Sequence, residues 1–144
     1  MKDFNRWNDK KKITNENFPV VGVHEREIWW VTLGLNVGIE TDGKHSEFKR
    51  PVLVIKRFNT EMVWILPMTS QIKSSIFFEK FDLQDSSYYV SLSQIKTLST
   101  RRFLRKVGMI QRDDFMRILK KVIAYFPIKN EDPLLSGSSR RPKP

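Results

Sequence analysis

Few side chains in this sequence are of the kinds that carry out enzyme chemistry alone or with a metal ion. The chain has no cysteine, and its two histidines, His24 and His45, lie in different segments. Neither histidine has neighbours at the spacing of metal ligands, so we expect no metal site and no cofactor. The lack of cysteine also removes disulfides and thiol nucleophiles, and it is typical of cytoplasmic proteins.

Arg50 and Thr69 form a pair that could act together on a phosphate group. Arg50 precedes the apolar segment 51–55, Thr69 follows the apolar segment 62–66, and a turn is predicted midway at Asn59. Antiparallel pairing across this turn brings the two side chains to the same end of a hairpin. A guanidinium presents a fork of donors matched to phosphate oxygens and keeps its charge, and a hydroxyl adds one hydrogen bond.

Polar and charged residues next to this pair could contact a nucleic acid. Ser70 and Gln71 could hydrogen-bond to base edges or to phosphates, and Lys49 and Lys73 add positive charge beside them. His45 lies in a long loop before Arg50 and could donate or accept a proton near neutral pH. We therefore include these five residues among the candidates for ligand contacts.

Each candidate also has a purely structural interpretation. Arg50 could form an ion pair with Glu40 or Glu47, and Thr69 could end a strand in an ordinary turn. Tyr88 could stack on a base, but one of two adjacent tyrosines in a strand must face the core, so we expect a core role for it. The common placement of Arg50 and Thr69 favours the functional interpretation.

Short apolar segments at even spacing predict a β-rich fold around these residues. Such spacing favours a small closed barrel over alternating strands and helices. The first strand is apolar on both faces, and a small barrel can bury only one, so a two-fold related copy or the N-terminal segment must cover the other. The predicted strands are 27–33, 51–55, 62–66, 76–81, 88–94 and 103–109.

Residues 113–126 form the clearest predicted helix, because their apolar residues fall on one stripe and Pro127 follows. Asp113 and Asp114 lie at its start, where a carboxylate interacts favourably with the helix dipole. Residues 128–144 are basic, polar and broken by proline, and we expect them to be a disordered tail.

Residues 1–25 read as an N-terminal appendage to the barrel. Phe4 and Trp7 share one side of a short helix, and the polar segment 14–17 breaks the pattern. We therefore divide the chain into this appendage, a unit at 26–127 that holds the barrel and the terminal helix, and the tail. We expect no signal sequence and no membrane-spanning helix.

Positive charge is concentrated in the last third of the chain. The formal net charge is +10, and residues 96–144 carry thirteen Lys and Arg against four Asp and Glu. Residues 26–95 carry eight of each sign. An excess of this kind suits a nucleic acid or an acidic protein partner, although a solvated face and tail would show the same profile.

Five motifs follow one another along residues 26–124. They are Glu27-Ile28-Trp29-Trp30-Val31, Lys49-Arg50-Pro51-Val52-Leu53-Val54, Pro67-Met68-Thr69-Ser70-Gln71, Ser93-Gln94-Ile95-Lys96-Thr97 and Arg105-Lys106-Val107-Gly108. Their order and spacing resemble the MazF/PemK family of toxin–antitoxin ribonucleases. Two departures stand out, because the loop 34–49 is longer than in the family and Ser93 replaces a common aspartate.

The resemblance implies an SH3-like small barrel with a C-terminal helix, a homodimer, and sequence-specific cleavage of single-stranded RNA. It implies that Arg50 and Thr69 are catalytic, and it adds Gln94 to the residues that contact RNA. RNA carries its own nucleophile, the 2′-hydroxyl, so such an enzyme needs neither a covalent residue nor a metal.

The resemblance also implies a cytoplasmic toxin that a cognate antitoxin inhibits. The basic last third of the chain predicts that the inhibiting segment is acidic and disordered before it binds. Two other functions stay open at this point: a gyrase-poisoning toxin of the CcdB type, and a noncatalytic barrel that binds nucleic acid.

Overall fold

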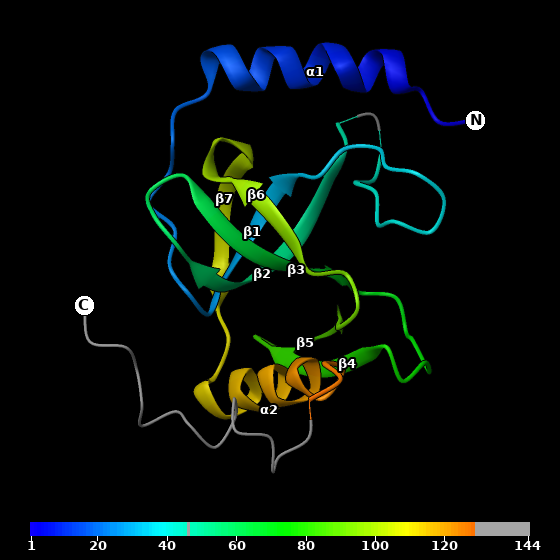
Figure 1. The fold of residues 1–144 in the computed structure, drawn as a ribbon, viewed down its shortest axis with the longest axis vertical. Helices are drawn as coiled ribbons and strands as arrows, with labels where there is room; N and C mark the ends of the chain where they lie inside the picture. The colour runs from blue at the N-terminus through cyan, green and yellow to red at the C-terminus, as the bar shows by residue number, and fades with distance from the viewer. Residues whose placement is uncertain (46, 129–144) are drawn as a thin grey trace.

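The computed structural model describes residues 1–45 and 47–128, which form seven strands, two α-helices and one 3₁₀ helix (Figure 1). The two α-helices lie at opposite ends of the sheet (Figure 1). In chain order the elements are α1 (Phe4–Asn17), β1 (Glu27–Thr32), β2 (Lys49–Arg57), β3 (Met62–Thr69), β4 (Phe78–Leu83), β5 (Ser86–Ser91), β6 (Lys96–Ser99), the 3₁₀ helix η1 (Thr100–Arg102), β7 (Phe103–Met109) and α2 (Arg112–Ile123).

The strands form one antiparallel sheet with the order β4-β5-β3-β2-β1-β7, and β6 pairs with β3 outside this path. Strand β3 connects the β4–β5 hairpin to the rest of the sheet, because its first part pairs with β2 and β6 and its last two residues pair with β5. The predicted mainly β, SH3-like fold with a helix at each end is confirmed. One detail is wrong: β4 and β7 end the path without pairing with each other, so the barrel is not closed.

Strands β2 and β3 form the predicted hairpin around Asn59. The side-chain oxygen of Asn59 accepts hydrogen bonds from the backbone N–H groups of Glu61 and Met62, both at 2.9 Å, which fixes the turn. Both strands run beyond the predicted segments 51–55 and 62–66, so they carry Arg50 and Thr69 within regular structure rather than in loops.

Two apolar clusters lie on the two faces of the central strands. Ile28 of β1 belongs to one cluster, and Val31 of the same strand belongs to the other; they are 1% and 0% exposed. The expectation that one chain can bury only one face of this strand is therefore wrong, because α2 and the β4–β5 hairpin cover the second face. The homodimer stays a prediction, but this argument no longer supports it.

Helix α2 confirms the predicted apolar stripe, since Phe115, Ile118 and Val122 are buried in the first cluster. It ends at Ile123 rather than at residue 126, and the next residues form tight turns in which Tyr125 N–H donates to Val122 and Phe126 N–H donates to Ile123. A residue that precedes proline avoids helical geometry, which is why the helix stops before Pro127.

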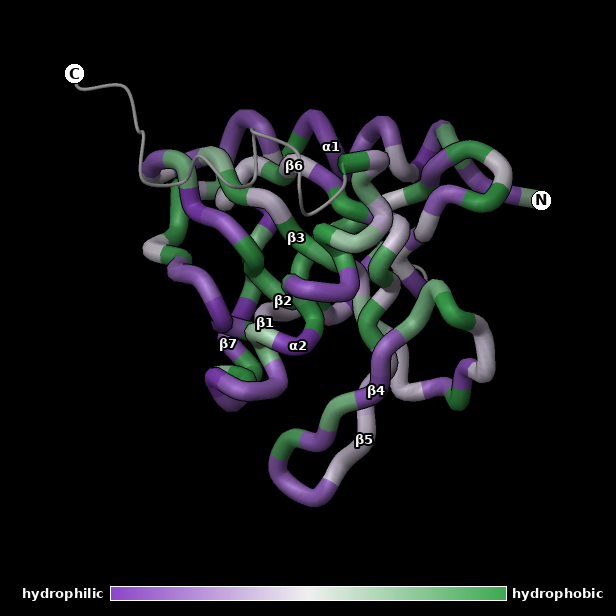
Figure 2. The backbone as a smooth tube through the Cα atoms, turned by 60° about the horizontal axis from the view of Figure 1, so that its bottom comes forward, coloured by the Kyte–Doolittle hydropathy of each residue, from purple (hydrophilic) through white to green (hydrophobic). Residues whose placement is uncertain are grey.

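Helix α1 is longer and more polar than predicted. It continues through the polar segment 14–17, and most residues along it are hydrophilic (Figure 2). Trp7 is 5% exposed, whereas Phe4 is 48% exposed, so the predicted two-residue apolar side reduces to one tryptophan. Asp3 caps the helix by accepting a hydrogen bond from the backbone N–H of Arg6.

The remaining boundaries differ from the prediction in small ways. The predicted strands 76–81 and 88–94 correspond to β4 and β5, whose ends differ from the prediction by two or three residues. Strand β6 was not predicted at all. The strand at 103–109 agrees with β7. Apart from residue 128, the predicted tail 128–144 lies outside the described residues. Within the described part of the chain, no helix is long and apolar enough to cross a membrane.

Candidate active site

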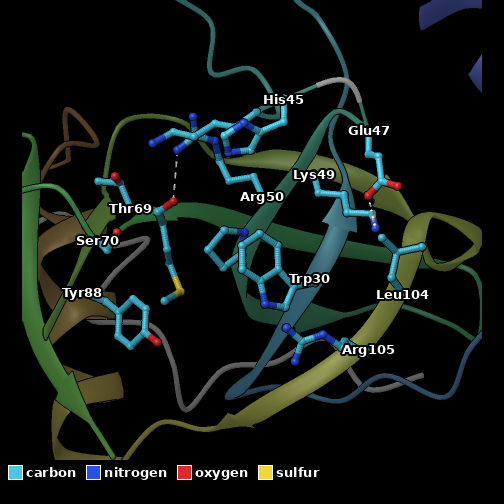
Figure 3. A pocket seen from close by; sticks show the side chains of 13 residues that line it. Trp30, His45, Glu47, Lys49, Arg50, Thr69, Ser70, Tyr88, Leu104 and Arg105 are labelled. Carbon is cyan, nitrogen blue, oxygen red and sulfur yellow. Dashed lines mark hydrogen bonds and ion pairs between the residues drawn. The ribbon is translucent and has the colours of Figure 1, made fainter. Parts of the chain in front are cut away.

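Two cavities meet at Arg50 and Thr69. The larger measures about 670 Å³ and the smaller about 260 Å³. Both are lined by Lys44, Arg50, Met68 and Thr69, so these residues form the wall between them. Figure 3 shows the larger cavity with Arg50 and His45 at one end and Trp30 and Arg105 at the other.

Arg50 reaches the cavities from the start of β2. In the β2–β3 register Val52 lies opposite Pro67, and continuing that register by two residues places Arg50 opposite Thr69. The predicted juxtaposition of the two side chains is therefore present. Its cause is the one expected from the sequence, an antiparallel hairpin that turns midway between them.

Two backbone carbonyls hold the Arg50 guanidinium in place. Its Nε–H donates to the carbonyl of Asp42, and Nη1 donates to the carbonyl of Met68 at 3.2 Å (Figure 3). A guanidinium has five N–H donors, and within residues 1–45 and 47–128 the other three have no hydrogen-bond acceptor. The alternative that Arg50 forms an ion pair with Glu40 or Glu47 is not seen among the described residues. Glu47 pairs with Lys49 instead, and Glu40 accepts a hydrogen bond from the N–H of Val37.

Burial lowers the pKa of the Arg50 guanidinium from its ordinary value, and the negative charge of Asp42 opposes this effect. An arginine that starts from so high a value still carries its charge at neutral pH. A half-buried cation bound only by backbone carbonyls is poorly compensated, and an anion that enters the cavity would compensate it.

Thr69 ends β3 with its side chain buried, at 6% exposure. Its Oγ1 accepts a hydrogen bond from the backbone N–H of Gln71 at 3.1 Å. Because this contact uses a lone pair, the hydroxyl proton stays available for donation. The turn after β3 thus orients the hydroxyl, and Thr69 lines both cavities together with Arg50.

The structure gathers most of the other predicted contact residues around the same point. His45, Lys49 and Ser70 line the larger cavity, and Gln71 and Lys73 line the smaller one. The backbone of His45 has φ 63°, a left-handed conformation that is uncommon for residues other than glycine but that histidine adopts more often than most. Lys49 forms an ion pair with Glu47, which also lines the larger cavity.

Gln94 lies apart from both cavities. Its side-chain amide accepts a hydrogen bond from the N–H of Thr41 at 3.1 Å and donates one to the carbonyl of Ile39 at 3.0 Å. Gln94 therefore holds the loop that carries Asp42, and through Asp42 it supports Arg50. A direct contact between Gln94 and RNA stays a prediction.

The larger cavity is also lined by residues that were not among the predicted contacts, and Trp30, Arg105 and Tyr88 are three of them. Trp30 lines it with the Arg105 guanidinium 5.7 Å from its ring centroid, and Tyr88 contributes from β5. Tyr88 also stacks on Phe81 beside the first core cluster, so the predicted core role describes one side of its ring. The available signal was the double tryptophan of β1, because alternation sends one of two adjacent indoles away from the core that buries the other.

Among the described residues, no three His, Cys, Asp or Glu side chains lie close enough to hold a metal ion. The site offers a fixed guanidinium, an oriented hydroxyl and surrounding positive charge. These groups suit a phosphodiester.

The chain thus folds as a small open β-barrel with Arg50 and Thr69 at one end of its central hairpin. Residues 24–126 match the family described as PemK-like, MazF-like toxin of type II toxin-antitoxin system, and the chain belongs to this family. A comparison with curated proteins gives no significant match.

Solved structures share the fold at low identity. MazF from Deinococcus radiodurans is 20% identical with a TM-score of 0.62, and the match covers 72% of this chain and 96% of that one. The Mycobacterium tuberculosis toxin MazF-mt6 is 16% identical with a TM-score of 0.55 and coverages of 72% and 99%. A mycobacterial endoribonuclease in complex with its cognate antitoxin is 14% identical with a TM-score of 0.53 and coverages of 85% and 100%.

Proposed function

We propose that this toxin is a sequence-specific endoribonuclease that cleaves single-stranded mRNA in the cytoplasm without a metal ion. The observation that carries the proposal is the Arg50 guanidinium, which two carbonyls fix beside the Thr69 hydroxyl where two cavities meet. The family match supports the same activity.

The proposed reaction uses the 2′-hydroxyl of RNA as the nucleophile. Its oxygen gives up its proton and attacks the adjacent phosphorus, the bond to the 5′-oxygen of the next nucleotide breaks, that oxygen takes up a proton, and a 2′,3′-cyclic phosphate remains. Arg50 stabilises the negative charge that develops on the phosphate oxygens, and Thr69 donates a further hydrogen bond to the same group. In this proposal neither residue forms a covalent bond with the substrate.

The residues that line the cavities supply binding in this proposal. Lys49, Lys73 and His45 attract the phosphate backbone, and Ser70 and Gln71 hydrogen-bond to phosphates or base edges. Trp30, with Arg105 against its ring, offers a surface on which a base can stack. The position of these groups around one point supports an RNA strand that passes over Arg50.

We also propose that the toxin is a homodimer and that an acidic antitoxin segment inhibits it. The solved relatives include a MazE–MazF complex from Deinococcus radiodurans, with 19% identity and a TM-score of 0.58. The positive charge of the last third of this chain supports an acidic inhibitor that competes with RNA. If so, cognate antitoxin displaces a labelled noncleavable RNA from the toxin, and added salt weakens the binding of both ligands. Simultaneous binding of RNA and antitoxin at full affinity would contradict competition.

Substitutions at Arg50 and Thr69 test the proposed activity. Arg50→Ala should slow RNA cleavage by roughly 10²–10³-fold, the loss typical of one transition-state donor. Arg50→Lys should also be slow, because an ammonium keeps the charge and loses the fork. Thr69→Ala should be impaired, and Thr69→Ser should retain activity because it retains the hydroxyl.

The matched control is Arg57→Ala, which removes a half-buried arginine from the other end of the same strand. It should leave the cleavage rate unchanged. The proposal would be overturned by an Arg50→Ala variant that is fully active and melts at the same temperature as the wild type. Growth arrest without RNA cleavage would instead favour a gyrase poison, and RNA binding without cleavage would favour a noncatalytic barrel.

A further inference from the structure

The N-terminal helix reaches the loop that holds the active-site arginine. Lys2, just before α1, forms an ion pair with the carboxylate of Asp42 at 2.9 Å and also donates to the carbonyl of Asn36. Asp42 in turn supplies the backbone carbonyl that accepts from Arg50 Nε. A residue from the N-terminal appendage is therefore separated from Arg50 by a single amino acid, Asp42.

Asp42 presents two different groups to its neighbours. Its carboxylate is occupied on both oxygens, because Oδ1 accepts from the backbone N–H of Asn36 at 2.6 Å and Oδ2 pairs with Lys2. Arg50 meets only the backbone carbonyl. The carboxylate nevertheless lies near enough to Arg50 for its charge to raise the pKa of the guanidinium against the effect of burial.

This arrangement leaves the Arg50 donors for a substrate. A carboxylate binds a guanidinium through two parallel hydrogen bonds, with the same donors that a phosphate would use. If Asp42 lost its own cation, it would have a second cation, Arg50, close by. A bidentate Asp42–Arg50 pair would then compete directly with the phosphate of RNA.

The packing of α1 keeps Lys2 at this position. Trp7 is buried against Phe48, with ring centroids 5.5 Å apart, and the Arg102 guanidinium lies 5.5 Å from its ring centroid. Gly34 makes room for the indole, since a Cβ at Gly34 would lie 2.0 Å from the Trp7 ring. The helix is thus docked by a tight contact one turn after Lys2.

Other contacts hold the same loop independently of Lys2. Lys96 donates to the Asn36 side chain at 3.1 Å, and Asn36 donates from its amide to the carbonyl of Thr41 at 2.8 Å. Gln94 binds the loop backbone on its other side. Loss of the Lys2 ammonium alone therefore removes the ion pair of the Asp42 carboxylate and leaves the loop anchored.

We propose that Lys2 is a positioning residue of the active site: it neutralises the Asp42 carboxylate and so keeps Arg50 available for the RNA phosphate. This inference rests on the proposed ribonuclease function, which makes Arg50 the phosphate-binding group. It gives the N-terminal helix a role in activity, although the helix lines neither cavity at Arg50.

The experiment compares full-length Lys2→Met with a double variant that also carries Asp42→Asn. Lys2→Met should slow single-turnover cleavage of a mixed-sequence RNA by roughly tenfold, less than the loss of a whole donor. The double variant should recover most of that rate, because asparagine has no charge with which to capture Arg50. Lys2→Arg should keep the wild-type rate, and Lys12→Met, which removes an exposed lysine from α1, is the matched control.

A second measurement reports on Arg50 without any cleavage. The ¹⁵Nε–H NMR signal of Arg50, assigned by its loss in Arg50→Lys, should shift in Lys2→Met and return toward its wild-type position in the double variant. Should wild-type protein fail to cleave RNA, the proposed function fails, and this signal alone still decides the positioning role.

An unchanged rate and an unmoved signal in Lys2→Met would overturn the inference. So would a slow Lys2→Met variant that Asp42→Asn does not rescue, because the effect would then not pass through the Asp42 charge. A signal that shifts without any change in the cleavage rate of an active enzyme would also overturn it.

Discussion

The two helices of this toxin are attached to the same sheet in opposite ways. Helix α2 buries the apolar stripe Phe115, Ile118 and Val122 in the larger core cluster, with acidic residues in its first turn and basic residues in its last. Helix α1 buries only Trp7 and Thr14 and has neither acidic residues in its first turn nor basic ones in its last, and Lys2 just before it forms an ion pair with Asp42.

This difference separates stability from positioning. The α2 stripe is part of the core that covers one face of β1, so α2 contributes to folding through buried apolar area. The docked α1 helix instead keeps Lys2, the charged residue just before it, against Asp42 in the loop that binds Arg50. We therefore expect damage to the α2 stripe to lower the free energy of unfolding, and loss of the Lys2 ammonium to act mainly on the site.

The largest expected effect on stability is at Ile118, which is 0% exposed. Ile118→Ala should lower the free energy of unfolding by about 2–5 kcal/mol, through lost apolar burial and the cavity left behind. The matched control is Ile123→Ala on the same helix, where the side chain is 55% exposed and the loss should be small. Chemical denaturation measures both, and the cleavage rate per folded molecule should stay unchanged in each.

Gly34 offers a sharper test of how α1 is docked. Gly34→Ala should expel Trp7, with a loss of up to roughly 3 kcal/mol beyond the strain of alanine at positive φ. Gly38→Ala is the matched control, because Gly38 also has positive φ but a Cβ there meets nothing within 4 Å. Proteolysis between α1 and β1 should accelerate in the first variant only. Equal behaviour of the two would show that the Trp7 contact does not hold the helix.

The smallest expected effect concerns Glu27 on β1, between the two helices. Burial raises the pKa of its carboxyl, but hydrogen bonds from His24 N–H and the Trp29 indole, together with the Lys106 ammonium, outweigh burial and leave the pKa below its usual value. A lowered pKa stabilises the fold above the unfolded value of about 4.5, and this contribution is lost as pH falls through the folded value.

Glu27→Gln should accordingly melt at a lower temperature than the wild type at neutral pH, and the two curves should converge in acid. Melting temperatures from pH 3 to pH 7 measure this difference. A gap that widened toward acid would have the wrong sign for a carboxyl with a lowered pKa.

The sequence predicted the parts of the molecule that follow from periodicity. The alternation in β1, the β2–β3 hairpin and the stripe of α2 come from local patterns, and the hairpin alone places Arg50 opposite Thr69. Strand β6 was not predicted because Lys96–Ser99 is only four residues long and its polar and apolar residues alternate weakly.

The contacts between distant segments could not be predicted. The Lys2–Asp42 ion pair joins residues forty positions apart, and the fit of Trp7 to Gly34 depends on how a loop folds over a barrel. The role of Gln94 has the same cause, since its partners Ile39 and Thr41 lie in an irregular loop with no periodic signal. Long-range polar contacts are set by the assembled fold, and the residues that form them look ordinary in the sequence.

The central claim is that a fixed guanidinium and an oriented hydroxyl cleave RNA through the substrate's own 2′-hydroxyl. The most direct test is to incubate purified protein with a mixed-sequence RNA in the presence of EDTA and to identify the ends of the fragments, with Arg50→Ala as the blank. We predict undiminished cleavage that leaves 2′,3′-cyclic phosphate and 5′-hydroxyl ends. Loss of cleavage in EDTA, or fragments that carry 3′-hydroxyl and 5′-phosphate ends, would contradict this account.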